Sequence, residues 1–319
     1  MNKRKLGSSE LSTSVIGFGA WAAGAAGLED VKEEQIEGAI RKAYDLGITL
    51  FDTAPAYGLG LAERVLGKVL KPIRENVIIA VKGSLARNEH GSSSIDAASM
   101  DIVQEVEASL RLLKTDYIDL YQVYWPEFTG KQSVDEIFGT LNKLVEEGKI
   151  RSIGVSDFNV QQLVTAQSVS NIVSLQSAYN LFQRNVEHAA LPYTNQQNIG
   201  FIARSPLAQG LLTGKFNYLT RLPKADVRLQ FNPLYSHKQF IKNIVIIEAF
   251  TGMAREIGKP LNQVAINWLL YRPSITSVVV GAKTSKQIEE NAAAASWRLS
   301  REDYEQISRL FETDSSYMI

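Results

Sequence analysis

The chain contains 319 residues, of which 34 are Lys or Arg and 34 are Asp or Glu, so its net charge is close to zero. With 45% hydrophobic and 21% charged residues, the composition is typical of a globular protein and argues against a nucleic-acid partner, an anionic membrane surface or disorder. The absence of cysteine excludes disulfides and thiolate metal ligands, and we expect no metal site. No run of 18 apolar residues is present, and MNKRKLGSSELS precedes only a short apolar run. We therefore expect no membrane helix, no signal peptide and a cytoplasmic location.

Short segments rich in β-branched residues alternate with longer helical patterns along the chain. Three of the short segments, VIIAV, YIDLYQV and SVVVG, are nearly continuous apolar runs, which is typical of parallel strands buried on both faces. The predicted strands cover residues 15–20, 49–52, 77–82, 117–124, 150–156, 172–176, 200–205 and 276–280.

Helical patterns lie between these strands, for example at 33–46, 62–70, 99–113, 134–147 and 160–168. Glycines of the helix C-cap type close several patterns, at Gly47, Gly148 and Gly258. Length alone allows either two domains or one barrel with insertions. The eight repeated units favour the α/β class and a single domain over residues 1–319, folded as a closed (β/α)8 TIM barrel.

Three segments depart from the repeat. Residues 3–14 contain a Gly-Ser-Ser turn between short extended pieces, which predicts a small β-hairpin that plugs the floor of the barrel. Residues 216–240 follow the seventh strand and show little periodicity, which predicts a long and functional loop. Residues 301–311 predict one extra helix at the C-terminus.

A competing interpretation is a dinucleotide fold of the Rossmann type. The run from Gly17 to Ala22 matches G-x-G-x-x-G/A after a strand, and Asp52 ends the next strand, where a ribose-binding acid belongs. However, AAGAAG is a poor start for a helix, and Asp52 lies 30 residues beyond Ala22 rather than about 20. The barrel is therefore the preferred prediction. A P-loop is absent because GLLTGK has one residue too few after its first glycine.

The candidate catalytic residues are Asp52, Tyr57 and Lys82, each at or just beyond the end of an apolar run. A phenol is a poor acid near neutral pH, so a catalytic Tyr57 needs a neighbouring cation, which Lys82 can supply. A buried Lys82 in turn needs a carboxylate such as Asp52. Each residue taken singly has a simpler explanation. Asp52 could cap a turn, Tyr57 could pack a loop, and Lys82 could bury only its aliphatic stem. Together they indicate an activated proton donor.

The sequence resembles the aldo-keto reductase family over nearly its whole length. The stretches that carry the resemblance are IGFGAW, GITLFDTAPAYG, LLKTDYIDLYQVYWPE, GKIRSIGVSDF, SLQSAYN, SPLAQGLLTGK and VVVGAKTSKQIEEN. The resemblance implies a barrel that binds NADPH in extended form at its C-terminal face. It also implies hydride transfer to an aldehyde or ketone, with Tyr57 as general acid, Lys82 lowering the pKa of Tyr57, and Asp52 holding Lys82.

The same resemblance assigns cofactor contacts. Ser156, Asp157 and Gln176 match positions that bind the nicotinamide carboxamide, and Lys283 matches the basic residue at the 2′-phosphate, which favours NADPH over NADH. Residues 205–215 match the pyrophosphate segment. The full set of implied cofactor residues is Gly19, Ala20, Trp21, Asp52, Ser156, Asp157, Gln176, Arg204, Ser205, Pro206, Leu207, Gly210, Leu211, Lys215, Gly281, Ala282, Lys283, Gln287, Glu290 and Asn291.

Several positions differ from the usual family pattern. Tyr124 replaces a catalytic His before Trp125 and Pro126; a phenol still donates one hydrogen bond, but it is bulkier and less easily charged. Asp157 replaces a common Asn, and Arg204 replaces an aromatic ring beside the nicotinamide. Lys283 and Gln287 replace arginines. No His lies in a matching stretch; His237, in the long loop, is the one candidate to reach the site.

The expected substrate is a small carbonyl compound, with a sugar or polyol derivative as one candidate. Trp21, Tyr57, Tyr124 and Trp125 are expected to line an aromatic mouth, which suits sugars and aryl aldehydes equally. Because Tyr124 is unusual, two other functions stay open. One is a cofactor-retaining sugar epimerase or isomerase, and the other is an NADPH-binding sensor or subunit with little turnover. The sequence does not specify an oligomeric state.

Overall fold

The computed structural model describes residues 1–23, 32–83, 102–124, 133–223 and 226–312. Eight parallel strands form a closed barrel in the order β10-β3-β4-β5-β6-β7-β8-β9. All eight predicted strands are present. Their bounds are β3 Ile16–Gly19, β4 Leu50–Thr53, β5 Ile78–Gly83, β6 Leu120–Tyr124, β7 Ile153–Ser156, β8 Ile172–Ala178, β9 Gly200–Arg204 and β10 Ile275–Gly281. The barrel excludes the Rossmann alternative: β3 leads into a short 3-10 helix at Ala20–Ala23, and β10 closes the sheet by pairing with both β3 and β9.

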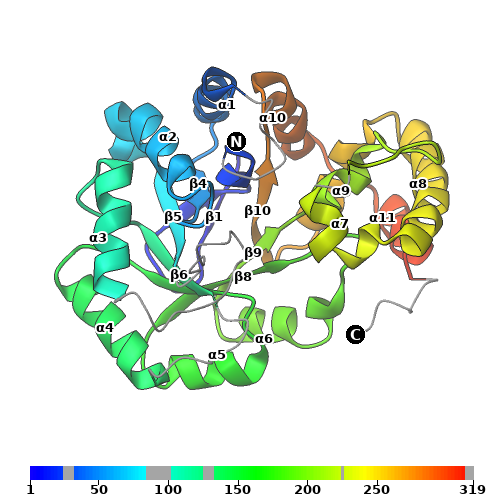
Figure 1. Ribbon diagram of the computed structural model, residues 1–319. Helices are drawn as coiled ribbons and strands as arrows, with labels where there is room; N and C mark the ends of the chain where they lie inside the picture. The colour runs from blue at the N-terminus through cyan, green and yellow to red at the C-terminus, as the bar shows by residue number, and fades with distance from the viewer. Residues whose placement is uncertain (24–31, 84–101, 125–132, 224–225, 313–319) are drawn as a thin grey trace.

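Helices surround the barrel in a ring, which Figure 1 shows along the barrel axis. They are α1 Glu33–Asp45, α2 Leu61–Leu70, α3 Ile102–Leu113, α4 Val134–Glu146, α5 Val160–Gln167, α6 Ala190–Gln196, α9 Leu261–Leu270 and α10 Ser285–Ala292. The predicted C-cap glycines adopt the left-handed conformation that favours glycine, with φ of 83° at Gly47, 73° at Gly148 and 71° at Gly258. The predicted extra helix is α11, Arg301–Leu310.

The N-terminal hairpin closes one end of the barrel, as predicted. Strands β1 Lys3–Lys5 and β2 Ser12–Ser14 pair antiparallel, and Leu6 follows β1 with no exposed surface. Leu6 packs in a cluster of side chains inside the barrel near the starts of the strands, with Leu50, Ile78, Ala80, Leu120, Val173, Ile202 and Val279. The hairpin therefore leaves the C-terminal ends of the strands available for a site.

The segment 216–240 is not the continuous loop that the sequence predicts. It contains α7 Val227–Phe231, a 3-10 turn at Pro233–Tyr235 and the first turn of α8 His237–Ile257. The buried residues of α8 begin only at Phe240 and continue through Ile244 and Ile247. Because the first turn of α8 is polar, helical periodicity is not visible in the sequence until that point. Figure 1 shows α7, α8, α9 and α11 together on one side of the barrel.

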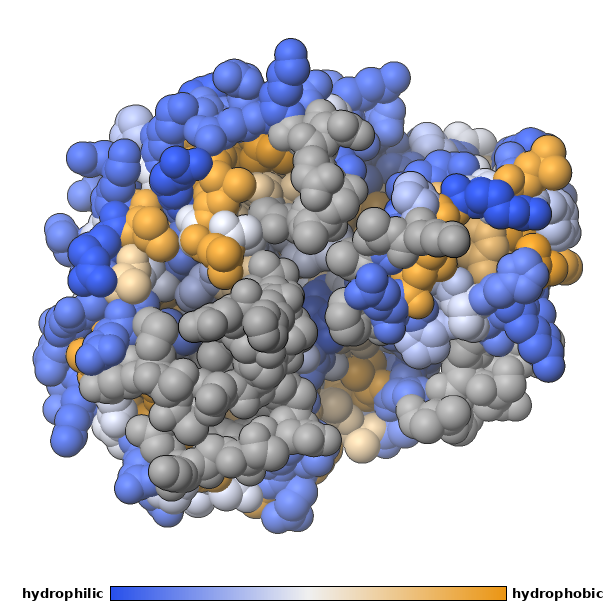
Figure 2. Space-filling model, in the orientation of Figure 1, coloured by the Kyte–Doolittle hydropathy of each residue, from blue (hydrophilic) through white to orange (hydrophobic). Residues whose placement is uncertain are grey.

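No helix among the described residues is both long enough and apolar enough to cross a bilayer. The described surface that faces the viewer in Figure 2 is mainly hydrophilic, and its hydrophobic areas are small and separate.

Candidate active site

A buried polar cluster lies inside the barrel where β4, β5, β6 and β8 end. Asp52 and Lys82 are 4% and 3% exposed, and Asp52 Oδ2 lies 2.5 Å from Lys82 Nζ. The other carboxylate oxygen of Asp52 accepts hydrogen bonds from Gln176 Nε2 at 2.8 Å and from Gln122 Nε2 at 3.2 Å. The two predicted charged residues therefore form one ion pair, which two buried amides hold in place.

The ion pair keeps Lys82 charged. Burial alone would lower the pKa of the ammonium group, but the Asp52 carboxylate and the Tyr57 hydroxyl beside it raise that pKa above its ordinary value. A buried charge is tolerated only when it is paired and hydrogen-bonded, which is the arrangement found here.

Tyr57 lies in the turn between β4 and α2, above this pair. The turn is held by hydrogen bonds from the Tyr57 N–H to the Ala54 carbonyl at 3.0 Å and from the Ala62 N–H to the Tyr57 carbonyl at 3.2 Å. Gly60, with φ of 86°, makes the sharp entry into α2, and an added Cβ there would lie 2.7 Å from Leu112 Cδ1. Lys82 Nζ lies 5.4 Å from the centroid of the Tyr57 ring.

Burial and neighbouring charges act in opposite directions on the pKa of Tyr57. Burial raises it above the ordinary value, and the charges of Lys82 and Arg204 act in the lowering direction without reversing the net effect. Lys82 therefore acts as predicted, but the phenol is protonated near neutral pH, which is the state that a proton donor requires.

Beside the cluster lie two buried polar atoms that have no hydrogen-bond partner among the described residues. One is the hydroxyl oxygen of Ser156, which is wholly buried, and the other is the side-chain oxygen of Gln176. Ser156 and Gln176 are register partners at the ends of β7 and β8. A buried polar atom without a partner is costly, so the pair fits a ligand that carries both a donor and an acceptor, such as a carboxamide.

Three of the residues that depart from the family pattern, Tyr124, Asp157 and Arg204, come together at the same rim. Tyr124 ends β6 and is the register partner of Ser156, and Asp157 follows Ser156. Arg204 ends β9, and its Nη2 lies 2.6 Å from Asp157 Oδ2. Burial raises the pKa of Tyr124; Asp157 adds to this effect and Arg204 opposes it.

The segment after β9 has an unusual backbone. Ser205, Ala208 and Gln209 have positive φ, as does Gly210 at 104°. Three N–H groups of the predicted pyrophosphate segment bond within the segment itself: that of Ala208 to the Ser205 carbonyl, and those of Gly210 and Leu212 to the Leu207 carbonyl. Leu211 is a buried core residue, so contact through its side chain is not available.

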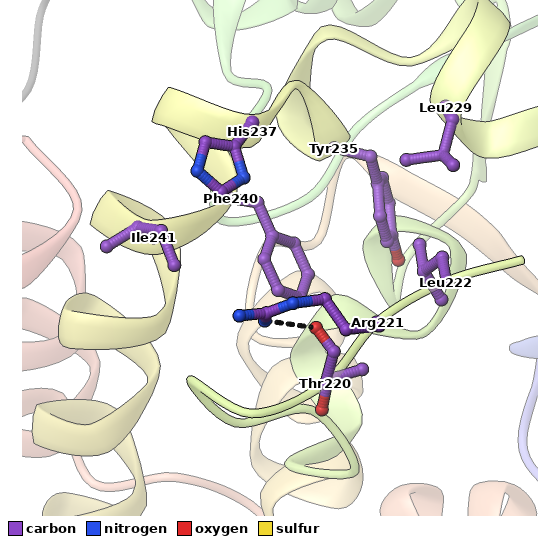
Figure 3. Close-up of a pocket in the computed structure, with 8 residues that line it drawn as sticks. All are labelled: Thr220, Arg221, Leu222, Leu229, Tyr235, His237, Phe240 and Ile241. Atoms are coloured by element: carbon purple, nitrogen blue, oxygen red, sulfur yellow. Dashed lines mark hydrogen bonds between the residues drawn. The ribbon is translucent and has the colours of Figure 1, made fainter. Parts of the chain in front are cut away.

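This segment is anchored from both sides. Asn180 Nδ2 donates to the Ser205 carbonyl at 3.0 Å, and the Tyr235 hydroxyl lies 3.0 Å from the Gln209 carbonyl oxygen. Tyr235 also lines a pocket of about 160 Å³ between the non-helical segment 220–222 and α8, shown in Figure 3. His237 lines the same pocket, whereas Tyr57, Lys82 and Tyr124 do not, so the structure does not bring this histidine to the predicted site.

Positive charge gathers beside the same segment. Burial lowers the pKa of Lys215, and the nearby charges of Arg228 and Lys283 lower it further. Arg228 Nη1 also donates to the Gln209 carbonyl at 3.1 Å. Asp226, which lies 2.5 Å from Arg228, opposes the lowering of the Lys215 pKa in part. The remaining positive charge around Lys215 suits a ligand that carries phosphates. Arg228 was not among the predicted cofactor residues, because its place depends on α7 and not on any sequence stretch next to Lys215.

Some of the predicted cofactor residues in and near α10 form hydrogen bonds or ion pairs within the protein. Gln287 Oε1 accepts the backbone N–H of Lys283 at 2.8 Å. Asn291 is 4% exposed and bonds to Asn262 at 3.0 Å, while Glu290 lies 4.0 Å from Lys286 on the exposed face. Of these residues, Asn291 is thus the least available to a ligand.

The remaining predicted residues are placed as follows. Gly19 ends β3 beside Asp52 and Gly281, Ala20 is buried, and Trp21 is 37% exposed in the following turn. Pro206 and Ala282 are buried close to the ends of β9 and β10. Trp125, predicted to line the mouth, lies outside the described residues, as do Pro126 and His90.

Comparison with known proteins agrees with this geometry. The family model "Aldo/keto reductase family" matches residues 15–312. The NADH-specific methylglyoxal reductase of Escherichia coli is 30% identical over 95% of this chain and 96% of its own length. A glycerol dehydrogenase from Gluconobacter oxydans superposes with a TM-score of 0.87 and 30% identity, covering 99% of this chain and 97% of that one. An aldo/keto reductase from Klebsiella pneumoniae, solved in complex with NADP and acetate, gives 0.74 and 26%, with 96% and 94% covered.

Proposed function

The chain belongs to the aldo/keto reductase family, and from this premise we propose that it uses NADPH to reduce an aldehyde or ketone, with Tyr57 as the proton donor. The observation that carries the proposal is the buried Asp52–Lys82 pair beneath Tyr57. Burying such a pair inside the barrel costs desolvation free energy. Its position next to a phenol therefore favours a functional role over a purely structural one. The pair lies near the ends of β4 and β5, and barrels of this type carry their catalytic residues at that end, which supports the proposal.

Reduction is balanced by one hydride and one proton. The hydride would come to the carbonyl carbon from NADPH when that cofactor is bound. Tyr57 donates its proton to the carbonyl oxygen, which gives an alcohol and leaves a phenolate that solvent reprotonates. Lys82 stabilises that phenolate because its positive charge faces the ring, and Asp52 keeps Lys82 charged and oriented. Tyr124 offers a neutral hydroxyl at the same rim.

The residues present fit the cofactor. Ser156 and the side-chain oxygen of Gln176 suit the nicotinamide carboxamide, because both are buried and without partners among the described residues. Lys215, Arg228 and Lys283 suit the phosphates. The Klebsiella relative was solved with NADP, and the Escherichia coli relative is named for NADH. We expect NADPH to bind more tightly than NADH, since the cationic cluster favours the additional phosphate.

The simplest test measures oxidation of NADPH with a panel of reactive aldehydes, including nitrobenzaldehyde, sugars and hydroxyaldehydes. We expect turnover by the wild-type protein and none by Tyr57→Phe, because phenylalanine keeps the ring and removes the proton. Fluorescence titration with NADPH serves as the control, since the variant should still bind the cofactor. Wild-type binding without any turnover would indicate a sensor instead. A change of sugar stereochemistry without net loss of NADPH would indicate an epimerase.

A further inference from the structure

A cavity outside the candidate active site lies between segment 220–222 and the start of α8. Its volume is about 160 Å³. Figure 3 shows the eight residues that line it, which are Thr220, Arg221, Leu222, Leu229, Tyr235, His237, Phe240 and Ile241. None of the candidate catalytic residues is among them. The cavity is thus a separate feature of the molecule, and the proposed reduction makes no use of it.

The inner wall of the cavity is aromatic and buried. Tyr235 and Phe240 are 1% and 8% exposed, and their ring centroids lie 5.9 Å apart with the planes 29° from parallel. Phe216 packs edge-on against both rings, at 5.9 Å from each. The Tyr235 hydroxyl lies 3.0 Å from the Gln209 carbonyl oxygen, so the polar end of this ring is already satisfied. The wall is therefore held in place by its own packing and offers an apolar surface.

The rest of the lining is mainly aliphatic and lies closer to the protein surface. Leu222 and Ile241 are half-buried, and Leu229 is 42% exposed. Protein interiors are closely packed, and voids larger than a water molecule are few. Apolar cavities of about 150 Å³ bind molecules of the size of benzene. The size and the lining of this cavity therefore suit a single apolar ring.

A cation lies at the mouth of the cavity. Arg221 is exposed, and its Nη1 donates to the Tyr218 and Thr220 carbonyls at 3.0 and 3.1 Å, which fixes the guanidinium group. Within the part of the chain that the structure describes, the Nε and Nη2 donors of Arg221 make no hydrogen bond. These two donors form the edge of the guanidinium group that suits both oxygens of a carboxylate. His237, also exposed, offers a ring N–H beside it.

No acid among the lining residues balances this cation. Two acids on adjoining elements already have partners. Asp226 lies 2.5 Å from Arg228, and Glu248 of α8 accepts the Tyr218 hydroxyl at 3.0 Å. The charge of Arg221 is therefore free to attract an anion to the mouth of an otherwise apolar cavity.

We propose that this cavity is a second ligand site, which binds a small aromatic carboxylate. The ring of the ligand packs against Tyr235 and Phe240, and its carboxylate pairs with the Nε and Nη2 edge of Arg221. His237 supplies one further hydrogen bond. The aromatic wall selects the ring and the cation selects the charge, as in ligand sites that combine an apolar lining with a few polar groups. The site does not depend on the proposed reductase function.

The test follows the histidine signals by NMR during a titration with benzoate at fixed pH. The chain has three histidines, and His237→Gln assigns the signal of His237. We expect benzoate to shift that signal saturably and to leave the signal of His188 unchanged, because His188 does not line the cavity. Benzamide keeps the ring and the planar head group but lacks the charge, so it should bind about tenfold more weakly. Benzoate bound at the catalytic cluster would not give the shift of His237.

Two variants remove the site in different ways. Arg221→Met removes the cation, so it should weaken benzoate about tenfold and leave benzamide unchanged. Leu222→Trp fills the cavity and should weaken both ligands. Arg255→Met, in the last turn of α8, and Leu219→Trp, at a side chain that is 84% exposed, are the matched controls. Both controls should bind benzoate as the wild type does.

Thermal unfolding of each variant establishes that it is folded before the titration. A His237 signal that benzoate does not shift overturns the proposal, and so does equal affinity for benzoate in the wild type and in folded Arg221→Met. A His237 signal that changes with protein concentration alone would show that a second copy of the chain fills the cavity, which also overturns it. None of these measurements requires turnover, so failure of the reductase proposal leaves this test unaffected.

Discussion

The two carboxylate oxygens of Asp52 accept hydrogen bonds from Lys82 Nζ and from two side-chain amides. A single residue thus positions the buried polar cluster. Gln122, one of the two amides, was not singled out from the sequence. A signal for it exists: Leu120, Gln122 and Tyr124 alternate along β6, so a residue two positions before a rim residue points into the barrel. Side chains that meet through hydrogen bonds across the barrel cannot be read from local pattern alone.

The buried ion pair gives a prediction about stability and activity together. Asp52→Asn should abolish turnover and lower the free energy of unfolding by about 3–5 kcal/mol, because it leaves the Lys82 charge buried and unpaired. Lys82→Met should do the same from the other side. The double variant Asp52→Asn/Lys82→Met should regain much of the stability and none of the activity, since the buried charges are gone but so is the cation behind Tyr57.

Urea denaturation and NADPH oxidation, measured on the same preparations, check this prediction. Glu305→Gln is the control, because it breaks the exposed pair with Arg301, which has side-chain exposures of 84% and 48%. Exposed pairs contribute little, so no measurable change is expected there. Strictly additive losses in the double variant would show that Asp52 and Lys82 do not act as a pair.

At the scale of elements, the eight strands and most helices could be predicted because each carries its own hydrophobic period. The segment 216–240 could not, because α7 is only five residues long and α8 begins with a polar turn. The association of Arg228 with Lys215 and Lys283 could not be predicted for the same reason. These residues come from three elements, and only the packed structure brings them together.

Glu63 of helix α2 has no basic partner among the described residues. Glu63 has no exposed surface, and burial raises its pKa to about 7, with Glu105 adding to this effect and Ser109 opposing it. The residue lies in the first turn of α2, which starts just after the Tyr57 turn. We therefore expect ionisation of Glu63 to destabilise α2 at its start, next to the turn that carries Tyr57.

The sign of the pH dependence follows from the raised pKa. Protonated Glu63 favours the folded state, so its contribution is complete below about pH 4.5 and is lost as the pH rises through about 7. Glu63→Gln should therefore gain stability over the wild type as the pH rises from 5 to 8, by up to about 3 kcal/mol. Thermal or urea unfolding across that pH range is the measurement. Glu75→Gln, at an exposed position, should show no such trend; equal curves for wild type and Glu63→Gln would contradict the assignment.

At the scale of the whole molecule, the two ends of the barrel have separate tasks. The strand starts are closed by Leu6 and the apolar side chains around it, and the strand ends carry Asp52, Lys82 and the rim residues. No residue of the floor cluster contributes a polar group to the site. Stability and catalysis should therefore respond to different substitutions, as in other barrels of this type.

Leu6→Ala tests this separation. The side chain is fully buried in the floor, so its truncation should lower the free energy of unfolding by about 2–5 kcal/mol through lost burial and a residual cavity. Because the cavity opens at the end of the barrel remote from Tyr57, kcat/KM for a good aldehyde should stay within about twofold of wild type at temperatures where the variant is folded. Leu219→Ala is the matched control: Leu219 is 84% exposed, and the same truncation there should change neither quantity. The opposite result is a large loss of kcat/KM in folded Leu6→Ala without a comparable effect on cofactor binding. It would mean that the floor cluster helps to set the geometry of the site. The hairpin would then contribute to catalysis as well as to stability.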